Sequence, residues 1–313
     1  MLAPQDTTLP QPPSRVGLIG LGEVGTIFAR ALAQLGVAWV GGWDVKLTPG
    51  HPEADAMRAR AVAAGATVCA DVAALCAQAQ LIISAVTAAN TLAAAELLAA
   101  QLRPGTWVLD LNSASPGTKQ QAAAAIEATG GRYVEAGVMT SVPPYGVRVP
   151  MLLGGPHAAA LAPVLQGWGM QVQVASDRYG VASATKMCRS VIIKGLEALV
   201  IESFTAARHY GVEDAMIATL HETFPGIDWA AQAAYFYSRV AQHGQRRAEE
   251  MREVARTVVE AGFEPVMADA TARKDDGMAA LRRAGALDHV AADAPWQVWA
   301  DALLAARASK TTS

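Results

Sequence analysis

The sequence predicts an α/β domain with a doubly wound parallel sheet, followed by an all-α domain. Between Val16 and about Ser176, short apolar segments typical of strands alternate with Ala-rich segments typical of helices. From Ser183 onwards, apolar residues recur with helical periodicity and no convincing strand is found. The length of 313 residues suits two domains. We expect a loose Pro-rich tail over residues 1–14, a sheet-containing domain over 15–177 and a helical domain over 178–313.

The elements follow from short apolar runs in the first domain and from longer periodic segments in the second. The expected strands are Val16–Ile19, Val37–Trp43, Thr67–Cys69, Leu81–Val86, Thr106–Leu111, Arg132–Glu135, Met151–Leu153 and Gln171–Val174. The helices expected between most of them are Glu53–Ala64, Asp71–Ala79, Asn90–Leu102 and Gly117–Thr129. The second domain should contain helices at Ser183–Tyr210, Val212–Glu222, Asp228–Gln242, Arg246–Gly262 and Ala270–Ala284, before an unassigned tail.

The turn after the first strand carries glycines at positions 20, 22 and 25, and a helical pattern opens directly behind it. In a dinucleotide-binding turn such glycines provide a tight bend, close approach to a pyrophosphate, and close packing of helix on strand. The amino terminus of the helix offers free N–H groups to the phosphates. The pattern predicts a Rossmann domain, the alternative being a glycine-rich turn that only packs. The residues expected to contact the cofactor here are Gly20, Leu21, Gly22, Glu23, Val24 and Gly25.

Asp44 ends the next strand pattern, 24 residues after Gly20, where a carboxylate can bind the ribose hydroxyls of the adenosine. Its charge would repel a 2′-phosphate, which favours NAD over NADP. Lys46 lies close by and keeps NADP possible. Further cofactor contacts are expected from loops at the carboxyl ends of later strands, at Val86, Thr87 and Asn112.

The composition limits the remaining function classes. A net charge of −3 argues against a nucleic-acid partner or an anionic membrane surface, and no apolar run approaches the length of a membrane span. The three cysteines (Cys69, Cys76 and Cys188) form no C-x-x-C pair and no disulfide framework, which suits a reducing cytoplasm. No His/Cys/Asp cluster has the spacing of a metal site, so we expect no metal.

Two segments carry polar groups suited to catalysis. In the loop after Leu111, Ser115 should cap a helix whose first residue is Pro116, which leaves Asn112 and Ser113 to face substrate or nicotinamide. On the long helix, Lys186, Ser190 and Glu197 share one narrow stripe. Burial near a helix amino terminus should lower the pKa of Lys186 and make it a general acid/base. A snorkelling lysine, or an ion pair with Glu197, explains the spacing equally well.

On these residues the chain resembles the β-hydroxyacid dehydrogenases related to 6-phosphogluconate dehydrogenase and 3-hydroxyisobutyrate dehydrogenase. That family joins an amino-terminal Rossmann domain to an all-helical carboxyl-terminal domain. The resemblance implies that Ser113, in the stretch from Asp110 to Pro116, is the substrate-binding serine. It also implies that Lys186 is the catalytic lysine. Ser190 occupies the place of the family's asparagine, so a substrate hydrogen bond there is shortened or lost.

Two further departures concern the substrate pocket. Where the family has Ser-Gly-Gly this chain has Met139-Thr-Ser, so Thr140 and Ser141 are the candidate substrate donors, and the following Pro-Pro-Tyr implies a more apolar pocket. The last hundred residues resemble a poorly characterised helical domain found behind phosphogluconate-dehydrogenase-like cofactor domains. There Arg246 and Arg247 could clamp a substrate carboxylate or phosphate, the alternative being a charged helix face with an Arg246–Glu250 pair.

The resulting hypothesis is an NAD-preferring dehydrogenase acting on a small-molecule β-hydroxy acid or its keto or semialdehyde form. The catalytic residues would be Lys186, Ser113 and Ser190. Reduction of an imine on the same scaffold is one alternative, and a non-catalytic NAD(H)-binding protein is another. By analogy with the fold we also expect a homodimer, and the cysteine pattern leads us to expect a cytoplasmic protein.

Overall fold

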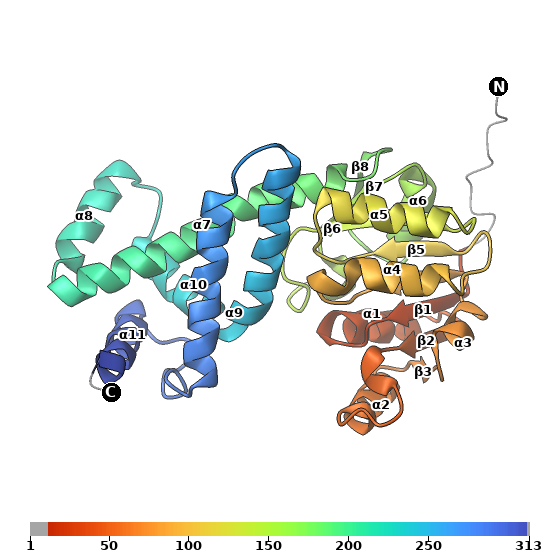
Figure 1. Cartoon of the computed structure of the whole chain (residues 1–313), viewed down its shortest axis with the longest axis horizontal. Helices are drawn as coiled ribbons and strands as arrows, with labels where there is room; N and C mark the ends of the chain where they lie inside the picture. Colours follow the sequence, from red (N-terminus) through yellow and green to blue (C-terminus); the bar gives the residue numbers. More distant parts are fainter. Residues whose placement is uncertain (1–11, 312–313) are drawn as a thin grey trace. The chain divides into compact units, whose positions relative to one another are not determined.

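The structure, a computed structural model, describes residues 12–311 and divides into two compact units, one up to Met187 and one from Cys188 (Figure 1). Residues 1–11 of the expected tail lie outside the described part. The division falls ten residues later than the expected boundary after residue 177. The reason is that the first turns of the long helix α7 (Val181–Tyr210) contact strand β6 (Arg132–Val138) of the first unit, for example through Ala182 against Gly137.

The first unit contains one eight-stranded sheet with the strand order β3-β2-β1-β4-β5-β6-β7-β8. Its other strands are β1 (Arg15–Ile19), β2 (Trp39–Trp43), β3 (Thr67–Val68), β4 (Leu81–Ser84), β5 (Trp107–Asp110), β7 (Met151–Gly154) and β8 (Val172–Ser176). All neighbours are parallel except β6 and β7. The doubly wound, mostly parallel sheet is therefore confirmed.

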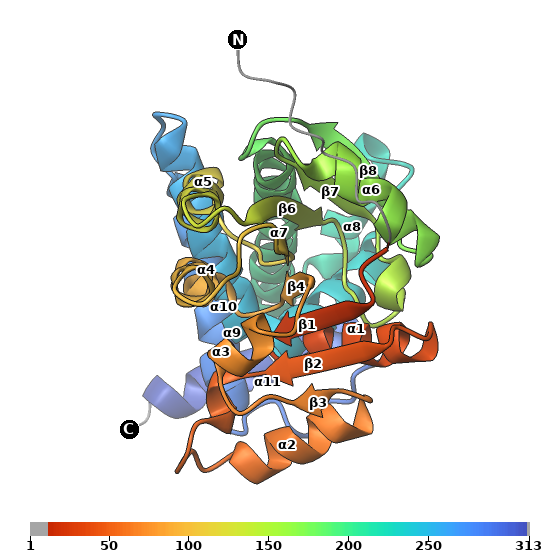
Figure 2. The same cartoon turned by 90° about the vertical axis from the view of Figure 1, so that its right-hand side faces the viewer.

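Helices cover both faces of this sheet (Figure 2). Successive residues of a strand point to the two faces alternately. On β4, for example, Leu81 and Ile83 join the apolar cluster under α1 and α6, whereas Ile82 joins the cluster under α3, α4 and α5. The helices are α1 (Glu23–Gln34), α2 (Ala54–Ala63), α3 (Val72–Cys76), α4 (Thr91–Ala99), α5 (Pro116–Glu127) and α6 (Ala158–Gly167), with short 3-10 turns η1 (Val45–Leu47), η2 (Ala88–Asn90) and η3 (Gly146–Arg148). Helix α6, which has Pro163 inside it, was not among the expected elements.

Within residues 188–311 of the second unit, all regular secondary structure is helical. Besides the continuation of α7 it contains α8 (Glu213–Thr223), α9 (Trp229–Glu260), α10 (Val266–Arg283) and α11 (Trp296–Thr311). Its core is rich in aromatic side chains, among them Phe204, Trp296 and Trp299. No helix within residues 12–311 combines the length and apolar character that a membrane crossing requires.

The expectation of two helices separated near His243 is wrong, since α9 runs unbroken through this segment. The reason lies at Gly244, which faces α10. A Cβ atom there would stand 2.7 Å from the Asp275 carbonyl oxygen, so the glycine allows two helices to approach closely and does not end one. Helix α11, in the tail left unassigned, is fixed by Trp296 and Trp299, which are both buried.

Charged side chains are buried among α7, α9 and α10 of the second unit. The Lys194 ammonium lies 2.5 Å from the Glu250 carboxylate, and Arg247 contacts Glu197. Asp275 is buried beside them. Burial raises the pKa of Asp275 to about 6, although the nearby Arg247 and Lys194 act in the opposite direction. Asp275 is therefore a buried carboxyl group that the folded protein holds protonated in mild acid.

We predict that the Asp275→Asn variant gains stability relative to wild type as the pH rises from about 4 to above 6. In the unfolded chain this carboxyl ionises near pH 3.8. The folded state therefore binds more protons in this window, and the wild-type free energy of unfolding falls as pH rises. The asparagine side chain does not ionise in this pH range, so the variant lacks this pH dependence. The gain should reach up to about 3 kcal/mol, since one pKa unit corresponds to about 1.4 kcal/mol. Urea unfolding of both proteins across pH 4–8 measures it, and a pH-independent difference would contradict a raised pKa.

Candidate functional site

The glycine turn lies where the strand order reverses, because β1 pairs with both β2 and β4. Gly20, the first residue after β1, has a φ of +89°, a backbone conformation that residues other than glycine rarely adopt. A Cβ atom on it would stand 2.4 Å from the Ala85 carbonyl oxygen at the end of β4. Gly20 therefore allows the turn to press directly against the neighbouring strand.

The other two glycines shape the cradle itself. A Cβ atom on Gly25 would stand 2.0 Å from the Gly20 carbonyl oxygen, so only glycine lets α1 start this close to the turn. Gly22, in contrast, faces open space, with no atom within 4 Å of its would-be Cβ. It also precedes α1 without a side-chain cap, so the first N–H groups of this helix remain for a ligand. The pyrophosphate of a dinucleotide fits this arrangement. Leu21, Glu23 and Val24 complete the turn.

Asp44 fixes the turn from the end of β2. Its Oδ2 atom accepts a hydrogen bond of 2.7 Å from the Leu21 N–H, and its Oδ1 atom accepts one of 2.9 Å from the Lys46 N–H. The side chain of Lys46 forms a salt bridge of 2.5 Å with Glu53. Asp44 therefore lies beside the glycine turn as the spacing predicted, while the ammonium group that could favour NADP is paired with a carboxylate.

Asn112 joins the loops after β4 and β5. Its Oδ1 atom accepts a hydrogen bond of 2.7 Å from the Val86 N–H, and its Nδ2 atom donates to Ser84 Oγ at 2.9 Å. Only 4% of the residue is exposed. Beyond Val86, the Thr87 hydroxyl accepts a hydrogen bond from Asn90. Asn112 thus holds two of the expected cofactor-contacting loops together at the carboxyl edge of the sheet.

A buried polar network underlies the Ser113 loop. The Asp110 carboxylate, at the end of β5, lies 2.9 Å from the Lys119 ammonium and accepts a hydrogen bond of 2.5 Å from the Tyr133 hydroxyl. It also accepts the N–H of Asn112 at 2.8 Å. Burial and the neighbouring Asp110 charge raise the pKa of Tyr133 well above its usual value, so its hydroxyl remains a donor. Ser115 caps α5 by accepting the Thr118 N–H, as expected.

The structure brings Lys186 and Ser113 together, 73 residues apart in the sequence. The Lys186 ammonium donates a hydrogen bond to Ser113 Oγ, and both side chains are half-buried. Lys186 lies on α7, one turn after Ala182, and its Cβ is 3.6 Å from where a side chain on Gly137 would begin. The missing side chain of Gly137 therefore lets α7 lie directly on β6 and carry Lys186 to the carboxyl edge of the sheet.

Glu135 is the site residue that sequence reasoning missed. It is fully buried in the middle of β6 and accepts hydrogen bonds from the Gly180 and Ala182 N–H groups and from Ser183 Oγ. The available signal was a charged residue inside a strand pattern that is otherwise apolar, which calls for buried donors. Asp110, the last residue of β5, carried the same signal.

The remaining candidates lie in two places. Thr140 is exposed and Ser141 half-buried in the loop after β6. Ser190 is buried on α7 in the second unit. Arg246 and Arg247 lie on α9 of the same unit. Arg246 pairs with Glu250, as the charged-face alternative predicted, and the buried Arg247 contacts Glu197. Both guanidinium groups are therefore engaged with carboxylates.

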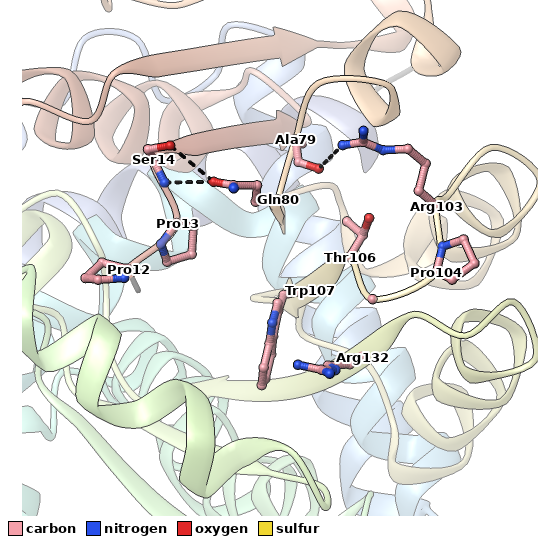
Figure 3. A pocket seen from close by; sticks show the side chains of 11 residues that line it. Pro12, Pro13, Ser14, Ala79, Gln80, Arg103, Pro104, Thr106, Trp107 and Arg132 are labelled. Atoms are coloured by element: carbon pink, nitrogen blue, oxygen red, sulfur yellow. Dashed lines mark hydrogen bonds between the residues drawn. The ribbon is translucent and has the colours of Figure 1, made fainter. Parts of the chain in front are cut away.

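A cavity of about 680 Å³ lies at the opposite edge of the sheet, around the first residues of β1, β4, β5 and β6 (Figure 3). Trp107 lines it with Arg132, whose guanidinium carbon lies 5.2 Å from the indole ring centre. Ligands of doubly wound sheets bind at the carboxyl ends of the strands, so this cavity is not the dinucleotide site. In the described part of the chain, no group of three or more His, Cys, Asp or Glu residues could hold a metal ion.

Comparisons with known proteins agree with this geometry. Residues 15–176 match the family model described as the NAD binding domain of 6-phosphogluconate dehydrogenase, and residues 207–275 match a domain of unknown function, DUF1932. A conserved hypothetical protein from Sinorhizobium meliloti 1021 is 35% identical, with a TM-score of 0.74, over 92% of this chain and 95% of that one.

Two structures at lower identity share the fold. One is the 3-hydroxyisobutyrate dehydrogenase of Mycobacterium tuberculosis, solved with L-serine (17% identity, TM-score 0.64, 92% of this chain and 98% of that one). The other is a reductive aminase from Aspergillus terreus, solved with NADPH4, cyclohexanone and allyl amine (20% identity, TM-score 0.55, 87% and 94%). The resemblance inferred from the glycine turn and Lys186 is confirmed: the chain belongs to the family defined by the NAD-binding domain of 6-phosphogluconate dehydrogenase, with a DUF1932 domain behind it.

Proposed function

We propose that this protein is an NAD(P)-dependent oxidoreductase that interconverts a β-hydroxy acid and its keto or semialdehyde form. The observation that carries the proposal is the Lys186–Ser113 hydrogen bond at the same edge of the first unit as the glycine turn. Oxidation of an alcohol requires a base for the hydroxyl proton and a bound hydride acceptor. The Lys186 amine beside the Ser113 hydroxyl would supply the base, and the glycine turn would bind the dinucleotide.

The bound nicotinamide would supply or accept the hydride. During oxidation, the neutral Lys186 amine would take the proton of the substrate hydroxyl as the carbon that bears this hydroxyl loses a hydride. The resulting Lys186 ammonium would later give its proton to water. In the reverse direction the Lys186 ammonium would donate its proton to the carbonyl oxygen of the substrate. Ser113 orients substrate and lysine because its hydroxyl already accepts a hydrogen bond from Lys186. Asn112 keeps the loops around them in register.

The substrate pocket would be completed by Thr140 and Ser141, which follow β6. Pro143, Pro144 and Tyr145 are exposed in the same loop and favour a bulky, unphosphorylated acid. Arg246 and Arg247 suit a substrate anion less well, since an anion would have to displace a glutamate from either one. Ser190 remains a candidate for a hydrogen bond to the substrate.

We also propose two features of the protein as a whole. The second unit exposes large apolar side chains, including Ile192 on α7 (71%) and Phe263 between α9 and α10 (72%), which would be covered in a homodimer. The location would be the cytoplasm, which the absence of any cysteine pairing pattern in the sequence favours.

Imine reduction is the second candidate function, and the fold shared with a reductive aminase supports it. In that case Lys186 would protonate the nitrogen. Activity that requires an amine together with a carbonyl compound would identify this function, and NADH binding without any turnover would identify a non-catalytic protein.

Replacing Lys186 by Met should lower kcat by a factor of about 100 or more, because general acid–base groups typically contribute 10²–10⁴-fold. NADH binding should be unchanged, since the glycine turn is untouched. Steady-state kinetics and NADH fluorescence titration measure the two effects. Lys274→Met is the matched control, because Lys274 is a surface lysine that pairs with Glu202 in the second unit. A Lys186→Met enzyme that keeps more than about a tenth of wild-type turnover would rule out this role.

Asp44 should make NAD the preferred cofactor. The Asp44→Asn variant keeps the size of the side chain but removes the charge that repels a 2′-phosphate. We expect the ratio of kcat/KM for NAD to kcat/KM for NADP to fall about tenfold, which corresponds to about 1.4 kcal/mol. Kinetics with both cofactors test this. If the wild-type protein instead prefers NADP, and Lys46→Met abolishes that preference, Lys46 and not Asp44 is the determinant.

A further inference from the structure

Strand β6 is connected to both members of the Lys186–Ser113 pair through alternate residues: Gly137 lies beside Lys186, and Tyr133 reaches the Ser113 loop through Asp110. Tyr133, Glu135 and Gly137 occupy every second position and therefore lie on one face of the strand. All three are buried. The residues between them, such as Val134 and Ala136, belong to the apolar cluster on the other face. Two polar side chains, Tyr133 and Glu135, thus lie on the same face of one strand.

Glu135 fixes the start of α7. Its Oε1 atom accepts hydrogen bonds from the Gly180 N–H at 2.9 Å and the Ala182 N–H at 3.0 Å, and its Oε2 atom accepts one from Ser183 Oγ at 2.9 Å. The first turn of α7 contains no acidic residue of its own. The carboxylate therefore provides the negative charge that a helix amino terminus favours, and it does so from a rigid strand.

Two glycines make this arrangement possible. A Cβ atom on Gly154 of β7 would stand 2.4 Å from Glu135 Oε1, so that position leaves room for the carboxylate. A Cβ atom on Gly137 would stand 2.9 Å from the Ala182 carbonyl oxygen and 3.6 Å from Lys186 Cβ. Ala182 and Lys186 are four residues apart, on one side of α7. The side of α7 that carries Lys186 is therefore held against β6.

Tyr133 acts on the other member of the pair. Its hydroxyl donates to Asp110 Oδ2 at 2.5 Å, while Asp110 Oδ1 accepts the Asn112 N–H at 2.8 Å and pairs with Lys119 at 2.9 Å. Asn112 directly precedes Ser113. The Tyr133 hydroxyl therefore fixes the carboxylate that fixes the main chain next to Ser113.

We propose that Glu135 and Tyr133 are positioning residues of this site, Glu135 for Lys186 and Tyr133, through Asp110, for Ser113. Burying carboxylates costs several kcal/mol each, and apolar side chains would fill the same space without that cost. Because Glu135 and Tyr133 lie on one face of β6, they hold Lys186 and Ser113 to the same strand. The sheet therefore sets the distance between the lysine and the serine. The kinetic consequence rests on the proposed function, whereas the geometry does not.

The test compares Tyr133→Phe and Glu135→Gln with wild type in the full-length protein. The pH dependence of trace acetylation of the Lys186 amine, followed by mass spectrometry of its peptide, reports the environment of that amine without any substrate. Losing the Ser113 acceptor disfavours the ammonium form, so the labelling midpoint should move to lower pH in both variants. One hydrogen bond corresponds to a shift of about half a pH unit or more.

Matched controls separate positioning from general loosening. Tyr179→Phe removes a half-buried hydroxyl that donates to Glu127 and to the Tyr133 carbonyl oxygen. Glu127→Gln removes a carboxylate that accepts hydrogen bonds from the Tyr133 N–H and the Tyr179 hydroxyl. Both should keep the wild-type midpoint. Tyr133→Phe is decisive because it changes no charge. Equal midpoints in wild type and Tyr133→Phe would overturn the proposal.

Kinetics then connect the geometry to turnover. We expect kcat to fall about tenfold or more in Tyr133→Phe and Glu135→Gln, with KM for the cofactor changed less than twofold, because small misplacements of a reacting group are costly. A loss shared equally with Tyr179→Phe and Glu127→Gln would contradict a positioning role. If wild type turns over no hydroxy acid or imine, the proposed function has failed, and the labelling midpoints still decide whether Glu135 and Tyr133 position the pair.

Discussion

The hydrogen bonding of two buried carboxylates, Asp110 on β5 and Glu135 on β6, is the constraint on which the rest of the site depends. A carboxylate removed from water is tolerated only when its oxygens find donors. Asp110 finds them in Tyr133, Lys119 and the main chain beside Ser113. Glu135 finds them in the first residues of α7. The hydrogen-bond donors that these two carboxylates require therefore hold the Ser113 loop and the start of α7 beside strands β5 and β6.

The sheet order explains why this pair and the glycine turn share one edge. Strands β1, β4, β5 and β6 are successive parallel neighbours, so their carboxyl ends lie side by side. Gly20 and Gly25 allow the turn after β1 to lie against the end of β4. Asn112 then connects β4 to β5, and Tyr133 connects β5 to β6. An unbroken series of contacts thus links the dinucleotide cradle to Lys186 within the first unit.

Much of this could be predicted from the sequence where the signal is local. The glycine spacing, the alternation of strands and helices, and the continuous helix carrying Lys186 were all found, because each depends on neighbouring residues. Long-range effects were missed. The unbroken course of α9 was missed because the close contact of Gly244 with α10 is invisible in the sequence, and Glu135 was overlooked because its donors lie 45 to 48 residues away. The pairing of Arg247 with Glu197 is a tertiary contact of the same kind.

A direct assay is the reduction of NAD⁺ and NADP⁺ by the purified full-length protein, followed by absorbance, across aliphatic and aromatic β-hydroxy acids. We expect turnover of at least one bulky, unphosphorylated acid, faster with NAD⁺ than with NADP⁺. Turnover of none of them, together with NADH oxidation only when an amine and a carbonyl compound are both present, would contradict it. NADH binding without oxidation of any substrate would contradict it equally.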